Sequence, residues 1–194
     1  MISWAELRLA CRGLLHLIRF DAQFVRHFDR SVAGALRSFW LALFILPYEI
    51  LSTYLVALPH NLPSMGFFLA ADVIGYLLGW TLFPLLLLSL ERTLDREREM
   101  PGCIAVLNWS SLIGIALQLP SLLILFLGFG EDFATGIAYT GVLFGAAIEA
   151  FLIAQCLRVP AWQAAILAVV DIVIGFALMH LIVALGHVPV PKVG

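Results

Sequence analysis

The sequence predicts an all-α integral membrane protein, a bundle of five transmembrane helices preceded by an N-terminal amphipathic helix at the membrane surface. Hydrophobic residues make up 62% of the 194 residues and charged residues only 12%, and the mean hydropathy is +1.02. Soluble domains carry about 25% charged residues, so this composition is that of a membrane protein. Five apolar stretches reach the roughly 20 residues that a helix needs to cross a hydrocarbon core of about 30 Å. Backbone groups in lipid must bond within their own segment, so these stretches are expected to be helical.

Short segments with turn residues separate the five apolar stretches. Proline, glycine or acidic residues occupy the gaps at 59–63, 100–102, 130–132 and 158–160. The expected spans are residues 38–58, 66–90, 104–129, 135–157 and 161–185. They form one transmembrane domain over residues 35–186, between a cytoplasmic basic segment at 1–34 and a short external tail at 187–194.

The arginines lie on one side of the expected bundle. Six precede the first span, three follow the second and one follows the fourth, whereas the gaps after the first and third spans contain neither lysine nor arginine. The positive-inside rule therefore places the N-terminus in the cytoplasm and the C-terminus outside. Arginine outnumbers lysine in a way typical of GC-rich bacterial genomes, so we expect the inner (cytoplasmic) membrane of a bacterium.

All three cysteines, Cys11, Cys103 and Cys156, fall on this reducing side, and no two form a CxxC pair. We therefore expect neither a structural disulfide nor a thiolate metal site.

The segment 1–34 has helical spacing of apolar and basic residues. The expected apolar face contains Trp4, Leu7, Cys11, Leu14, Leu15 and Ile18, and the expected lipid-facing basic residues are Arg8, Arg12 and Arg19. A basic amphipathic helix binds anionic lipid headgroups at the inner membrane surface. The simpler interpretation is an interfacial anchor, continued by Phe20, Phe24 and Phe28, and the alternative is lipid sensing or recruitment of a partner.

A second charged segment, residues 91–99, follows the second span. Its charges of opposite sign are spaced i,i+3, which predicts a short solvated helix that continues the span and ends at residues 100–102. The mixed signs make it a poor nucleic-acid site, so no nucleic-acid partner is expected.

Four acids lie inside spans that contain no lysine or arginine: Glu49, Asp72, Glu149 and Asp171. An ionised acid at the centre of a membrane helix costs about 2.5–3.5 kcal/mol, so these side chains are expected to be buried between helices. His180 is a fifth buried ionisable candidate, placed nine residues after Asp171 and therefore on the opposite side of that helix.

Small residues share a helix face with each acid, and small residues mark the places where membrane helices approach closely. The expected helix-packing glycines are Gly75, Gly79, Gly141, Gly145 and Gly175. Such faces can bind another membrane protein or a second copy of this chain. Because no basic partner is available in the spans, the acids are best explained as interhelical hydrogen-bonding groups. A proton or cation path, or polar recognition of a lipid or protein helix, stays open.

Enzyme motifs are missing from the sequence. It contains no HExxH, GxGD or GxSxG motif and no Asp-rich pair for diphosphate-bound magnesium. His60 and His187 are too isolated to predict a metal site. We therefore expect no catalytic residues, no cofactor and no bound metal.

The segment Ala35-Leu-Arg-Ser-Phe-Trp40 leads into a first span that contains Pro47, and Gly75-Tyr76 lies in the second. With five spans, short loops, a cytoplasmic N-terminal segment and an external C-terminus, the chain resembles the Yip1-domain family of small polytopic membrane proteins. The resemblance implies a membrane organiser or accessory protein and transfers no catalytic residue.

Two functions of different classes remain. The first is an integral membrane scaffold or accessory protein that binds partner helices or lipids through its small-residue faces, with the buried carboxyls as interhelical hydrogen-bonding groups. The second is a small proton- or cation-coupled transporter that uses the intramembrane acids. The sequence shows no internal repeat, which counts against the second, although dimerisation could supply the symmetry.

Overall fold

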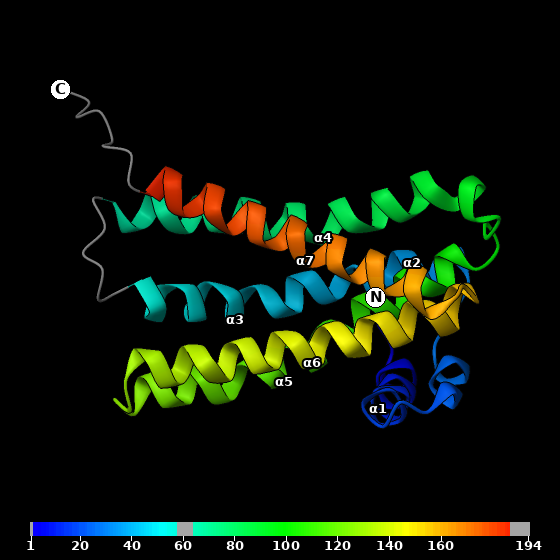
Figure 1. The fold of residues 1–194 in the computed structure, drawn as a ribbon, viewed down its shortest axis with the longest axis horizontal. Helices are drawn as coiled ribbons and strands as arrows, with labels where there is room; N and C mark the ends of the chain where they lie inside the picture. Colours follow the sequence, from blue (N-terminus) through cyan, green and yellow to red (C-terminus); the bar gives the residue numbers. More distant parts are fainter. Residues whose placement is uncertain (1, 58–63, 187–194) are drawn as a thin grey trace.

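The computed structural model describes residues 2–57 and 64–186, and every regular element within them is a helix (Figure 1). Five helices are long and apolar enough to cross a membrane. They are α3 (Trp40–Ala57), α4 (Met65–Leu94), α5 (Met100–Phe126), α6 (Glu131–Leu157) and α7 (Ala161–Gly186). Three shorter elements precede them: α1 (Trp4–Ile18), the 3-10 helix η1 (Ala22–His27) and α2 (Val32–Ser38). The predicted all-helical membrane bundle of five spans is confirmed, while the expected tail and the gap at 58–63, with His60 and His187, lie outside the described residues.

The spanning helices pack in an order that differs from their order in the chain. Helix α4 contacts α3 on one side and α7 on the other, and α6 contacts both α7 and α5. Helix α2 packs against α5, and α3 makes a smaller contact with α5, which closes the bundle. The helices run side by side along the long axis of the molecule (Figure 1). The last spanning helix in the chain therefore lies between the second and the fourth.

Two helices begin about one turn earlier than predicted. The prediction of a turn at residues 100–102 is wrong, because these residues form the first turn of α5, where Pro101 is tolerated since its nitrogen needs no helical partner. Helix α6 begins at Glu131, which places Glu131 and Asp132 beside the positive end of the helix dipole.

The predicted continuation of the second span as a short solvated helix is confirmed for residues 91–94 and wrong for 95–99. Helix α4 ends at Leu94, where Asp95 adopts a left-handed conformation with φ of 54° and terminates the helix.

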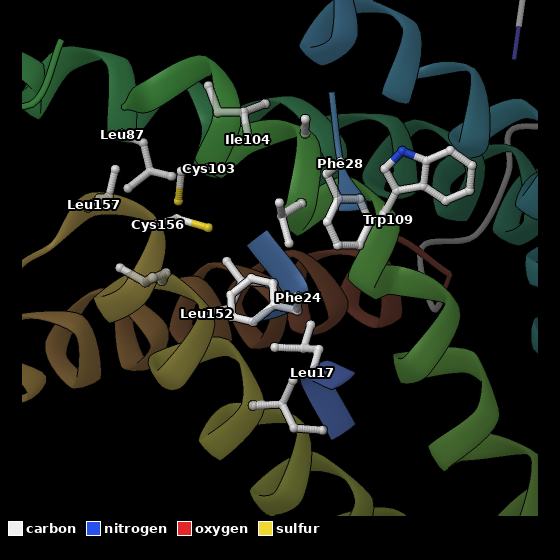
Figure 2. Packing of buried hydrophobic residues seen from close by; sticks show 14 of the residues in the cluster. Leu17, Phe24, Phe28, Leu87, Cys103, Ile104, Trp109, Leu152, Cys156 and Leu157 are labelled. Atoms are coloured by element: carbon white, nitrogen blue, oxygen red, sulfur yellow. The ribbon is translucent and has the colours of Figure 1, made fainter. Parts of the chain in front are cut away.

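The apolar core is concentrated at the end of the bundle where α4 joins α5 and α6 joins α7. We call it the basic end, because Arg92, Arg96, Arg98 and Arg158 follow these helices there. Leu17, Phe24, Leu87 and Leu152 are fully buried in this core, which joins the N-terminal elements to the spanning helices (Figure 2). The N-terminal segment is thus part of the folded core.

The residues that α1 buries against the bundle overlap the predicted membrane-facing apolar face only at Leu14. It buries Ala10, Gly13, Leu14 and Leu17, whereas Trp4, Cys11, Leu15 and Ile18 of the predicted apolar face are exposed. The prediction that the following phenylalanines anchor the segment in the membrane surface is wrong for Phe24 and Phe28, because both are buried in the core. The reason is that small residues of α1 allow close contact; a Cβ on Gly13 would meet the ring of Phe28.

A short network holds the connection from η1 to α2. Arg37 donates to Asp29 at 2.6 Å, and the backbone N–H of Ser31 donates to the same carboxylate at 3.0 Å. These interactions, the Ser31 backbone N–H foremost, hold the pKa of Asp29 below its ordinary value.

The lowered pKa of Asp29 predicts a pH dependence. A carboxylate with a depressed pKa in the folded state stabilises the protein above its unfolded pKa of about 3.9, and this stability is lost as the pH falls through the folded value. The thermal stability of wild type and Asp29→Asn in detergent is therefore expected to differ at pH 6 and to converge as the pH falls through the lowered folded-state pKa of Asp29. A difference that is the same from pH 7 to pH 3 would contradict this assignment.

Candidate functional site

The four intramembrane acids form two pairs on different helices. Glu49 of α3 interacts electrostatically with Asp72 of α4, whose carboxyl also hydrogen-bonds Thr53. Glu149 of α6 and Asp171 of α7 are in side-chain hydrogen-bonding contact. We call these the outer pair and the inner pair, because Glu49–Asp72 lies nearer the end opposite the basic end. Each pair joins helices that are neighbours in the bundle.

The expectation that these acids are buried is wrong for the residues as a whole. Glu49, Asp72, Glu149 and Asp171 are each half-buried, because each pair lies at a helix–helix contact rather than in the core at the basic end. One oxygen in each pair is nevertheless enclosed, since Asp72 Oδ2 and Glu149 Oε1 have no exposed surface and no hydrogen-bond partner. Each pair thus contains an acceptor whose hydrogen-bonding capacity is unmet.

A proton or a cation between the oxygens of the inner pair would favour the contact of the two carboxyls. An ionised carboxylate only accepts hydrogen bonds, so two carboxyls in contact require at least one proton. Two ionised carboxylates in contact also repel each other strongly when they are shielded from water. The Glu149–Asp171 contact is therefore a site that can take up one positive charge.

A cavity of about 370 Å³ adjoins the inner pair near the middle of the spanning helices. Helices α4, α5, α6 and α7 supply its walls, which include the aromatic side chains of Trp80 and Phe83. Its polar lining residues are Asn108, Ser110, Ser111, Gln118, Glu149 and Asp171. Because each water takes up about 30 Å³, there is room for several waters or for a small hydrated cation.

One wall of the cavity is fixed by a buried polar contact. Asn108 donates from Nδ2 to Ser38 Oγ at 2.8 Å, and Ser38 Oγ in turn donates to the Ala35 carbonyl at 2.7 Å. Both Asn108 and Ser38 are buried. This chain joins α5 to α2 and restrains the Asn108 amide at the edge of the cavity.

Two aromatic residues of α4 lie between the outer pair and the cavity. The Tyr76 hydroxyl donates to the Ala42 carbonyl of α3 at 2.8 Å and interacts electrostatically with Glu49. The Tyr76 ring contacts that of Trp80, with centroids 6.0 Å apart, and Trp80 lines the cavity. Helical spacing could have identified both residues, because they follow Asp72 at i+4 and i+8 on one helix face.

Four of the five expected packing glycines face other helices of the same chain. Gly75 and Gly79 face α7, and Gly141 and Gly145 face α5. Among these five glycines, Gly141 comes closest to a backbone atom, because a Cβ there would lie 3.1 Å from the main-chain oxygen of Leu117. An added Cβ on Gly175 would have no neighbouring atom within 4 Å. These faces are thus used mainly inside the bundle.

His180 does not belong to the site. It is exposed, and its ring Nδ1 lies 2.8 Å from the Phe176 carbonyl of its own helix, so the expectation of a buried histidine is wrong. The reason is its position half a turn away from Asp171, on the outer side of α7. Residues 2–57 and 64–186 contain no group of three histidines, cysteines or acids that could hold a metal ion.

Two arginines bind C-terminal carbonyls of α6 at the basic end. Arg96 donates from Nε to the Leu157 carbonyl at 2.7 Å, and Arg30 donates to the Cys156 carbonyl at 3.5 Å. The last carbonyls of a helix lack intrahelical partners and carry partial negative charge, which favours cations there. The two side chains thus fix the end of the helix that carries Glu149.

Comparison of the chain with protein-family models, with curated proteins and with solved structures finds no match. The resemblance to the Yip1-domain family therefore stays a prediction. The five long apolar helices identify an integral membrane protein, and its further assignment depends on the geometry of the two acid pairs and the cavity.

Proposed function

We propose that the protein is a small proton- or cation-coupled transporter whose ion-binding site is the inner pair. The observation that carries this proposal is the contact between Glu149 and Asp171 beside a cavity of about 370 Å³ near the middle of the spanning helices. Intramembrane acids that face a cavity are characteristic of ion and proton pathways. The aromatic ring of Trp80 at the same cavity adds a surface that attracts cations.

Ionisable groups also occur on both sides of the inner pair along the bundle. The outer pair and Tyr76 lie toward one end, and Cys103, which interacts electrostatically with Glu149, lies toward the basic end. Protons move between such groups through short hydrogen-bonded steps or bridging waters. The outer pair is therefore the second binding station that we propose for the transported ion.

The scaffold function is less well supported, because it needs small-residue faces that are free to bind a partner. Gly75, Gly79, Gly141 and Gly145 face helices of the same chain. Of the five expected packing glycines, Gly175 alone has no atom within 4 Å of an added Cβ, so it keeps the open space that a partner helix or a second copy would need. The scaffold or accessory role is therefore the alternative against which the transport experiment is designed.

The proposed orientation in the membrane places the basic end in the cytoplasm, in keeping with the positive-inside rule. The exposed surface of α1 carries Arg8, Arg12 and Arg19 beside exposed Trp4 and Leu15. Basic residues next to exposed apolar side chains bind anionic headgroups at the membrane surface. We propose that α1 contacts lipid in this way, in the inner membrane of a bacterium.

Transport can be tested with the full chain reconstituted in liposomes that contain a pH-sensitive dye. Wild-type protein is expected to change the internal pH when a proton, sodium or potassium gradient is imposed. Glu149→Gln keeps the size of the side chain but binds the ion less well, so flux should fall strongly while it stays above the level of empty liposomes. Glu131→Gln is the matched control, because Glu131 is an exposed acid of the same helix and its loss should leave flux unchanged.

Absence of flux in wild type under all three gradients would contradict the proposal. Recovery of a stable membrane-protein partner or a homodimer by the same inactive preparation would then favour the scaffold function.

A further inference from the structure

The side chains of Cys103 and Cys156 meet in the core at the basic end. Cys103 belongs to α5 and Cys156 to α6. Both residues are fully buried, with an exposed fraction of 0%. Their thiols are in hydrogen-bonding contact, and Figure 2 shows the two sulfur atoms side by side. Two thiols in contact are the arrangement from which a disulfide forms, although the sequence separates them widely.

The two cysteines lie in different electrostatic surroundings. Cys103 is in the first turn of α5, whose N-terminus carries partial positive charge, and Cys156 is in the last turn of α6, where the partial charge is negative. Arg30 adds a full positive charge within electrostatic reach of Cys103. Burial, Cys156 and Glu149 oppose negative charge on Cys103, so the first attack is assigned to Cys103 from its position at the positive end of α5 beside Arg30; the thiolate is the reactive form of cysteine.

Arg30 is held at this place by close packing. Its guanidinium group lies over Gly102, where a Cβ would be 2.7 Å from Arg30 Nε. The Nε atom is enclosed and has no hydrogen-bond partner, while the terminal nitrogen Nη2 donates to the Cys156 carbonyl. Arg30 therefore holds a cation beside the two buried thiols and at the C-terminal end of α6.

We propose that Cys103 and Cys156 form a reversible dithiol–disulfide site that is oxidised by small hydroperoxides. Cys103 attacks one oxygen of hydrogen peroxide, the O–O bond breaks, and Cys103 sulfenic acid and one water form. The thiol of Cys156 then attacks the Cys103 sulfur, the S–O bond breaks, and a disulfide and a second water form. In total the two thiols lose two electrons and two protons, and the peroxide takes up both.

The burial of the two cysteines selects the oxidant. Both sulfurs are covered by core side chains such as Leu87 and Leu157, so large disulfides and quinones have no direct access. Hydrogen peroxide is nearly as small as water. Glu149 interacts electrostatically with Cys103 and also lines the polar cavity, which brings that cavity close to the thiols.

The disulfide would tie together two walls of the cavity. Helices α5 and α6 are joined at the opposite end by residues 127–130, and the new bond would close the other end of this helical hairpin. A cross-link of this kind removes conformational freedom mainly from the unfolded chain. Oxidised protein is therefore expected to unfold at a higher temperature than reduced protein.

The proposal can be tested on the purified full chain in detergent after brief treatment with hydrogen peroxide. Intact mass should fall by two hydrogens, peptide mapping should link Cys103 to Cys156, and dithiothreitol should restore the original mass. Cys156→Ala should accumulate a sulfenic acid on Cys103, detected with dimedone, whereas Cys103→Ala should give little label on Cys156. Cys11→Ala is the matched control, because Cys11 is exposed and its removal should leave the link unchanged.

Wild-type protein in which both buried cysteines can still be alkylated after treatment and unfolding would overturn the proposal, and this measurement needs no variant to fold. Equal or greater dimedone labelling of Cys156 would overturn the assignment of Cys103 as the attacking thiol. Neither result depends on ion transport, so the dithiol site and the proposed transport function can fail separately.

Discussion

Glu149→Gln and Asp171→Asn are expected to reduce ion flux by similar factors, and the double variant is expected to lose no more than either single variant. The reason is that the two carboxyls are in contact and take up the same positive charge, so removal of either one impairs the shared site. Residues that act as a unit give strongly non-additive effects, whereas independent residues give effects that multiply. The measurement is the initial rate of dye response in liposomes for wild type and the three variants.

The control is the same comparison of two single variants with their double variant, made with one residue from each acid pair, Glu149→Gln and Asp72→Asn. These carboxyls belong to separate pairs, so their effects are expected to be closer to multiplicative. Multiplicative losses for Glu149 and Asp171 would show that the two acids act independently and would refute a shared site. An unchanged rate in both single variants would remove the inner pair from the transport pathway.

Phe24→Ala is expected to cause the largest loss of folding stability of any single substitution considered, about 3–5 kcal/mol. Phe24 is fully buried, and its ring lies 5.8 Å from that of Phe151 in α6. Truncation leaves a cavity at the contact between the N-terminal elements and the spanning helices. The loss can be measured from unfolding in mixed detergent and SDS micelles, followed by circular dichroism.

Phe20→Ala is the matched control for this prediction. Phe20 also contacts the Phe151 ring, with centroids 5.4 Å apart, but its side chain is 42% exposed. Its truncation removes less buried surface and creates no closed cavity, so the loss should be clearly smaller. Equal losses for the two variants would mean that Phe24 is not the residue that fixes the N-terminal segment to the bundle.

The membrane class and the number of spans could be predicted from sequence because each spanning helix must bury its own backbone hydrogen bonds in lipid. Length and apolar composition therefore identify each helix on its own. The pairing of acids could not be predicted in the same way, because it depends on which helices are neighbours. Glu149 meets Asp171, and Glu49 meets Asp72, because α7 lies between α4 and α6 while α3 packs on α4.

The N-terminal segment shows a second limit of sequence reasoning. Apolar residues occur on more than one side of α1, so helical spacing alone did not decide between Leu17, which is buried, and Leu15, which is exposed. Tertiary contacts with η1 and α5 made that choice. The contact between Cys103 and Cys156 was missed for the same reason, since it joins opposite ends of two antiparallel helices and leaves no local pattern.

The position of α7 between α4 and α6 has a consequence for biosynthesis. Helices are synthesised in chain order, from the N-terminus onward, so α6 is complete before the helix that carries Asp171 has left the ribosome. Until α7 inserts, Glu149 has no carboxyl partner and its side of the bundle is open to lipid. Completion of the inner pair is therefore a late event of assembly, and chains truncated before residue 161 are expected to be substrates for membrane quality-control proteases.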